Sequence, residues 1–144
     1  MPGTITGTIE RIPTQQGRPQ SVKITLSAIG NSANGSYPAA VINTLSGIAN
    51  TWDLRGLKLY SVKILPGSPP PTAASNLTIT DANGVDLLGG KGFGAIPVSG
   101  SSWIPAGPAN YAFAALIQDT ITANISGNSV NSAAITIILE LTGD

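Results

Sequence analysis

Alternation of apolar and polar residues at every second position is the feature that most restricts what this chain can fold into. The run from Ser21 to Ala28 is the clearest case, because apolar residues fill its even positions and polar residues its odd ones. Successive side chains of a β-strand point to opposite faces of a sheet, so the run predicts a strand with one face in a core and the other in water. Residues 133–141 repeat the pattern, with Ile135, Ile137, Leu139 and Leu141 on one face.

The rest of the chain carries the same β signals and almost no helical ones. No window shows a long run of strong helix formers with a 3.6-residue period. Further strands are expected at residues 4–12, 39–45, 57–65, 76–80, 85–88, 111–117 and 120–125. Gly, Pro and Asn separate these segments at the spacing of an all-β domain. We therefore predict an all-β fold, an antiparallel β-sandwich of about eight strands that is jelly-roll-like in its connections.

The length predicts one domain over residues 1–144, with residues 1–20 as an extended N-terminal strand or arm. The strongest turn signal is Asn83-Gly84, which predicts a hairpin between the strands at 76–80 and 85–88. The Pro-rich stretch 66–71 and the Gly-, Pro- and Ser-rich stretch 89–107 are expected to be loops. Long loops of this kind often carry function.

The charge content points towards an assembly. Charged residues make up 10% of the chain, and its seven basic and seven acidic residues cancel, whereas soluble domains average about 25% charged residues. Free monomers usually keep a net charge that resists association, so a neutral, charge-poor chain suits a subunit of a larger structure. A stable extracellular domain rich in Thr, Ser and Asn has the same composition, and composition alone leaves both interpretations open.

The residue inventory disfavours catalysis and metal binding. The absence of His and Cys excludes the usual triads, the usual general base and thiolate zinc sites. Asp81 and Asp86 flank the predicted turn and resemble a glycosidase pair or, with Asn83, part of a calcium loop. Carboxylates beside a tight turn more often accept backbone hydrogen bonds, and the later Glu of a calcium loop is missing. We expect no enzyme activity and no catalytic, cofactor-binding or metal-binding residue.

Two classes of partner are also disfavoured. The basic residues are scattered without interleaved aromatic residues, so we expect no nucleic-acid binding. The apolar stretches 112–117 and 135–141 are far shorter than the roughly 20 residues of a spanning helix. The first residues, Met1-Pro2-Gly3, have no cationic start and no apolar run, so neither a membrane span nor a secretory signal is expected.

Both Trp residues stand in polar surroundings, Trp52 beside Asp53 and Trp103 after Ser102. An aromatic side chain in such a place can stack on a sugar, anchor a protein interface or cap the end of the core. The sequence leaves these three roles open.

Two neighbouring segments carry a family resemblance. The segment Leu57-Lys58-Leu59-Tyr60-Ser61-Val62-Lys63-Ile64-Leu65-Pro66-Gly67, followed by residues 77–90 from Leu77 to Gly90, resembles a pattern of small structural proteins of tailed bacteriophages. The resemblance covers these two segments only and describes a hairpin rather than chemistry. It implies a virion component, such as a small β-sandwich protein that decorates or cements a capsid, with no enzymatic role.

We therefore expect a non-enzymatic virion structural protein, made in the host cytoplasm and located on the capsid surface, that stabilises the phage head as a decoration or cement protein. The expected partners are the major capsid protein and further copies of the chain, in a homo-oligomer such as a trimer. The expected contact surfaces are residues 2–8, 65–71 and 89–103, with Ile5, Pro69, Pro70, Phe93 and Trp103 at the interface.

Two alternatives stay open. One is a carbohydrate-binding β-sandwich module on a fibre or tail, with Trp52, Trp103 or Tyr111 as a stacking platform. The other is a structural subunit of the tail or baseplate, which differs from a head protein only in its partner.

Overall fold

The computed structural model describes residues 1–12, 21–45 and 54–143. This described part contains nine β-strands and one short 3-10 helix, η1. The elements are β1 Thr4–Ile12, β2 Ser21–Ile29, β3 Ala40–Val41, η1 Ile42–Thr44, β4 Lys58–Pro66, β5 Asn76–Thr80, β6 Ser102–Pro105, β7 Ala115–Leu116, β8 Thr122–Ser126 and β9 Ala134–Thr142.

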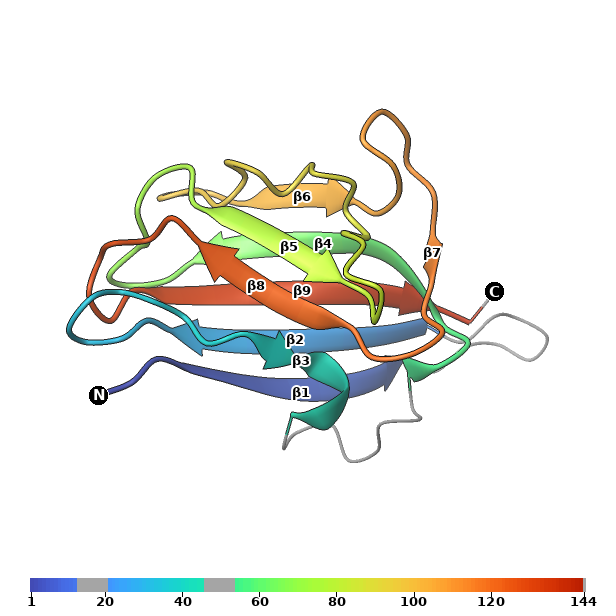
Figure 1. The fold of residues 1–144 in the computed structure, drawn as a ribbon, viewed down its shortest axis with the longest axis horizontal. Helices are drawn as coiled ribbons and strands as arrows, with labels where there is room; N and C mark the ends of the chain where they lie inside the picture. The colour runs from blue at the N-terminus through green and yellow to red at the C-terminus, as the bar shows by residue number, and fades with distance from the viewer. Residues whose placement is uncertain (13–20, 46–53, 144) are drawn as a thin grey trace.

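The strands form two antiparallel sheets that face each other (Figure 1). The large sheet has the order β1-β2-β9-β4-β6, and β7 also pairs with β4. The small sheet has the order β3-β8-β5. In Figure 1 the small sheet lies in front of the middle of the large one, while β1 and β6 run along opposite edges of the large sheet.

The core lies between the sheets, and the alternation of the sequence explains which residues fill it. The inward residues of β2 are at most 1% exposed, and those of β9 at most 3%. They meet inward residues of the small sheet, such as Leu77 and Ile79 of β5, which are fully buried. The antiparallel β-sandwich predicted from the alternation is therefore confirmed.

The strand pairs are nested in the order of the chain. Both strands of the pair β3-β8 lie between β2 and β9 in the sequence, and β4, β6 and β7 lie between β3 and β8. A jelly roll nests four such pairs in two Greek keys. In the described residues the segment between β4 and β6 pairs with itself only through two isolated bridges, Ser75 with Ile96 and Thr80 with Asp86, while its strand β5 pairs with β8. The jelly-roll connection stays a prediction.

The hairpin predicted around Asn83-Gly84 is wrong, because residues 85–88, its expected second strand, form no strand. The turn itself is present, and the Gly84 N–H donates to the Asp81 carbonyl over 3.0 Å. Beyond it, the Asp86 carboxylate accepts hydrogen bonds from the backbone N–H groups of Ile79, Leu88 and Gly90 at 3.1, 3.1 and 2.9 Å. A side chain thus takes the place of most of a second strand.

The strand predicted at residues 39–45 is correct only over β3. The Asn43 side chain is buried, and its carbonyl oxygen accepts a hydrogen bond from the Ile121 N–H at 2.8 Å. The Ile42 N–H donates to the Ile121 carbonyl at the same distance. This pairing through a side chain lets the backbone turn into η1 instead of continuing as a strand.

The loop predicted at residues 89–107 contains β6, and the strand predicted at 111–117 is reduced to β7. β6 lies at the edge of the large sheet, where Pro105 is tolerated because none of the other described strands needs its missing N–H. Its Trp103 points outward and its Ile104 inward, at 67% and 5% exposure. The segment before β7 instead folds back, with the Phe113 N–H bound to the Ala106 carbonyl at 3.0 Å.

Candidate functional site

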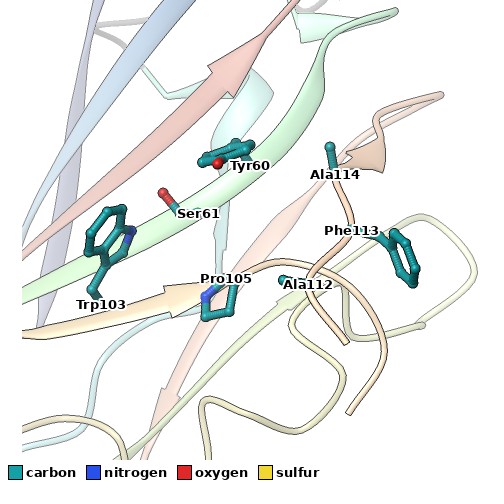
Figure 2. Close-up of a pocket in the computed structure, with 7 residues that line it drawn as sticks. All are labelled: Tyr60, Ser61, Trp103, Pro105, Ala112, Phe113 and Ala114. Atoms are coloured by element: carbon teal, nitrogen blue, oxygen red, sulfur yellow. The ribbon is translucent and has the colours of Figure 1, made fainter. Parts of the chain in front are cut away.

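The candidate site is a hollow on the outer face of the large sheet, beside the edge strand β6. Its volume is about 320 Å³. Figure 2 shows the seven residues that line it, and we call them together the aromatic hollow: Tyr60, Ser61, Trp103, Pro105, Ala112, Phe113 and Ala114. β4 and β6 supply four of them, and the segment before β7 supplies the other three.

A β-bulge in β4 places Tyr60 at the hollow. The register of β4 against β9 shifts between Leu59, which faces Leu141, and Ser61, which faces Glu140. The extra residue, Tyr60, is 59% exposed and stands beside the hollow in Figure 2. Bulges commonly redirect one side chain in this way near functional sites.

Ser61 forms the polar floor of the hollow. The residue is buried, and its hydroxyl donates to the Glu140 carboxylate at 3.2 Å. The Lys63 ammonium contacts the same carboxylate oxygen at 3.1 Å. Both charged side chains are partly exposed, so this ion pair adds at most about 1 kcal/mol to stability. Its main effect is to leave the floor of the site without net charge.

Trp103 forms one wall of the hollow. It is opposite Lys63 in the register of β4 and β6, and the Lys63 ammonium lies 5.3 Å from the centre of the Trp103 ring. A cation above an indole face is attracted by about 0.5–1 kcal/mol at an exposed site. Lys63 therefore links the indole to the Glu140 carboxylate and restricts the orientation of the ring.

The opposite wall is the segment 107–114, which Lys91 fastens to the rest of the molecule. The Lys91 ammonium donates to the carbonyls of Tyr111 at 2.6 Å and of Ala106 at 3.3 Å. In this segment Tyr111 stacks on Phe113, with their ring centres 5.8 Å apart. Both rings are more than 60% exposed, and in Figure 2 the Phe113 ring points away from the hollow.

A second hollow, of about 300 Å³, lies next to the first and shares Tyr60 with it. Three charged side chains line it: Lys23 of β2, Lys63 of β4 and Glu140 of β9. Tyr60 therefore lies between a hollow lined by aromatic residues and one lined by charged and apolar residues.

The structure brings only some of the predicted site residues together. Trp103 lines the hollow, and Tyr111 stacks on one of its lining residues. Ile5 is half-buried on β1, and Phe93 is exposed in the Gly-rich segment after Asp86. Pro69 and Pro70 are exposed after β4. Trp52 lies outside the described residues.

Tyr60 and Phe113 were not among the site residues predicted from the sequence. For Tyr60 a signal existed, because the buried apolar positions of residues 57–64 change from odd (Leu57, Leu59) to even (Val62, Ile64) across this residue. Such a change of phase within one strand indicates a bulge. No comparable signal marks Phe113, whose place depends on distant contacts.

The other candidate sites have structural roles. The Asp81 carboxylate accepts the N–H groups of Asn83 and Val85, each at 2.9 Å, as expected for a turn. No group of three or more His, Cys, Asp or Glu residues in the described segments is placed to hold a metal ion. Within the same segments, no helix has the length and apolar character needed to cross a membrane.

Comparisons with known proteins add no relative. No protein-family model, no curated protein and no solved structure matches the chain.

Proposed function

We propose that the chain is a non-enzymatic structural protein of a virion, a decoration or cement subunit of a phage head, and that its aromatic hollow binds the major capsid protein. The observation that carries this proposal is the exposure of Tyr60, Trp103 and Phe113 around one hollow. Trp and Tyr dominate the residues whose removal costs most affinity in protein interfaces.

The chemistry of the hollow suits a neutral, apolar segment of a partner protein. Trp103 and Tyr60 give it aromatic sides, and the Lys63–Glu140 pair beneath them leaves no net charge. A proline- or leucine-containing loop of a capsid subunit would bury apolar surface there without leaving a charge unpaired. Several such contacts per oligomer, the trimer expected from the sequence among them, would add up to firm attachment.

The choice of a virion partner rests on the resemblance and the charge content. The resembling segment 57–67 contains Tyr60 and Ser61, so the part of the chain that resembles phage proteins also contributes to the hollow. The neutral, charge-poor composition favours the same class of protein.

The test is co-sedimentation of the purified protein with phage heads that lack it. We expect saturable binding in a fixed ratio to capsid subunits, and a loss of about 30-fold in affinity for Trp103→Ala, the effect of an interface residue worth 2 kcal/mol. Val85→Ala is the control, since Val85 is 58% exposed and lies outside the hollow and outside the predicted contact surfaces. Equal effects of both variants would refute the role of the hollow, and a wild-type protein that ignores heads would refute the decoration role.

The fold of the variant needs its own check. Trp103 is largely exposed, so Trp103→Ala should keep the circular dichroism spectrum of the wild type. Unfolding of the variant would show that Trp103 supports the core rather than an interface.

Carbohydrate binding is the second candidate, favoured by the position of the buried Ser61 hydroxyl between the Tyr60 and Trp103 rings (Figure 2). Sugars bind by stacking on aromatic rings and by hydrogen bonds to polar groups. Lys63 already lies above the Trp103 ring, so a sugar would use the opposite face of that ring or the ring of Tyr60. Binding to a glycan array that Tyr60→Ala and Trp103→Ala both abolish would replace the capsid proposal with this one.

A further inference from the structure

The edge strand β1 has the properties of a contact between two copies of the chain. Among the described strands β1 pairs with β2 alone, so none of them occupies its other edge. The strand is nine residues long, contains no proline and pairs with β2 without a register shift. Proteins usually protect an open edge with proline, a bulge, a charge or a very short strand. Residues 4–9 have none of these protections.

The sequence of β1 is symmetrical about Gly7. Ile5-Thr6-Gly7-Thr8-Ile9 reads the same in both directions. Two copies of a strand that pair antiparallel about a two-fold axis place residue i opposite a fixed residue j of the other copy. With the axis at Gly7, Ile5 faces Ile9 of the second copy and Thr6 faces Thr8 of the second copy. Paired Ile and paired Thr are both favourable neighbours across strands.

The faces of the two sheets also match in this arrangement. Ile5 and Ile9 lie opposite Ala28 and Ile24 of β2, point to the core side and are half-buried against the core. Thr6 and Thr8 are exposed on the outer face. Each residue faces one that is an even number of positions away in the sequence, so both belong to the same face of the strand. The core sides of the two copies therefore lie on the same side of one continuous sheet. The four half-buried Ile side chains would then close an apolar seam.

The charges permit this contact. Glu10 and Arg11 are the charged residues of β1, and they would face Thr4 and Gly3 of the second copy. The two Glu10 residues of a pair would lie at opposite ends of the contact, about 20 Å apart at about 3.4 Å per residue. This separation exceeds the screening length of about 8 Å in physiological salt.

We propose that two copies of the chain associate through antiparallel pairing of β1 about a two-fold axis at Gly7. The proposal does not depend on the phage role or on the aromatic hollow, which lies at the opposite edge of the large sheet. One strand pair buries less than the roughly 800 Å² per partner of a standard interface, so the dimer is weak and depends on concentration. An isologous contact of this kind closes at two copies and differs from the trimer expected from the sequence.

Two double variants with substitutions at the same exposed positions test the register. In Thr6→Lys/Thr8→Lys each new lysine faces a lysine of the second copy, and the dimer should be lost. In Thr6→Lys/Thr8→Glu each lysine faces a glutamate, and the dimer should be kept or strengthened. Sedimentation equilibrium of the wild type should show the average mass rising from 14.5 kDa towards twice that value with concentration. A wild-type protein that stays monomeric at millimolar concentration, or two variants that behave alike, would overturn the proposal.

A cross-linking experiment tests the same register independently. The chain contains no Cys, so single cysteines can be introduced without interference. Facing residues of an antiparallel pair have their Cα atoms about 4.5–5.5 Å apart, within the range of a disulfide. A mixture of Thr6→Cys and Thr8→Cys proteins should therefore oxidise to a cross-linked heterodimer faster than either protein alone forms a homodimer. Equal rates in all three samples would exclude the proposed register.

Discussion

Replacement of Lys91 by methionine should loosen one wall of the aromatic hollow while the sandwich stays folded. The Lys91 ammonium holds the segment 107–114 through the carbonyls of Tyr111 and Ala106. A hydrogen bond to a charged group contributes about 1.5–3 kcal/mol, and the bond to Tyr111 is exposed, so we take about 2 kcal/mol for the pair. The methionine side chain keeps the length of lysine and removes the donors. The opening of this segment should therefore become about 30-fold more frequent.

Amide hydrogen exchange measures this opening directly. The Phe113 N–H, which is bound to the Ala106 carbonyl, should lose about 30-fold of its protection. Amides of β2 and β9 should keep theirs, because the core does not involve Lys91. Lys58→Met is the matched control, since it removes an ammonium group from β4 that makes no hydrogen bond or ion pair in the described structure. Unchanged protection of Phe113 in Lys91→Met would refute the role of Lys91 as the fastening of this wall.

Two further predictions concern the stability of the fold. Asp86→Ala should lower the free energy of unfolding, measured in urea, by about 2–4 kcal/mol, because three backbone N–H groups lose their acceptor. Asp86→Asn keeps one oxygen and should lower it by about half as much. Equal losses in the two variants would contradict the role of the Asp86 carboxylate as the acceptor. The Tyr37 hydroxyl donates to the Ala133 carbonyl, and burial raises the pKa of Tyr37 from 10.0 to about 12. Because the pKa of Tyr37 is higher in the folded chain than in the unfolded one, the neutral hydroxyl stabilises the fold fully below pH 10. This stabilisation disappears as the pH rises from 10.0 to about 12. Because Tyr37 is only partly buried, the loss is limited to about 1 kcal/mol. Tyr37→Phe should remove this part of the pH dependence in urea titrations.

The sandwich could be predicted from sequence because burial in β2 and β9 follows the period of a strand directly. Ile24 and Leu141 are buried, and each stands between two polar neighbours in the sequence. The predicted strand at 4–12 coincides with β1 and the one at 76–80 with β5, since turn residues bound both. In these segments local pattern and tertiary packing favour the same structure.

Prediction failed where a side chain replaced a backbone partner. The Asp86 carboxylate and the Asn43 amide each bind amides of another segment, and neither interaction leaves a periodic trace in the sequence. The residues of the aromatic hollow could be predicted only in part for a similar reason. Trp103 was identified from its polar neighbours, but the approach of Phe113 depends on a contact made by Lys91, twenty residues away from Tyr111. Contacts of this kind require the fold to be known first.

The two proposed contacts lie at opposite edges of the large sheet, so both can be occupied at once and each can be weak. β1 forms one edge, and β6, with the aromatic hollow beside it, forms the other. A second copy at β1 therefore leaves the hollow open, and a dimer presents two hollows in a fixed relation. When one hollow of such a dimer is bound to a capsid, the second binds from a high effective concentration, and attachment strengthens by about 10²- to 10⁴-fold wherever the spacing of capsid sites allows both to engage. Two modest surfaces, a small hollow and a short strand edge, would then suffice for stable decoration, and the neutral, charge-poor character of the chain would favour their use together.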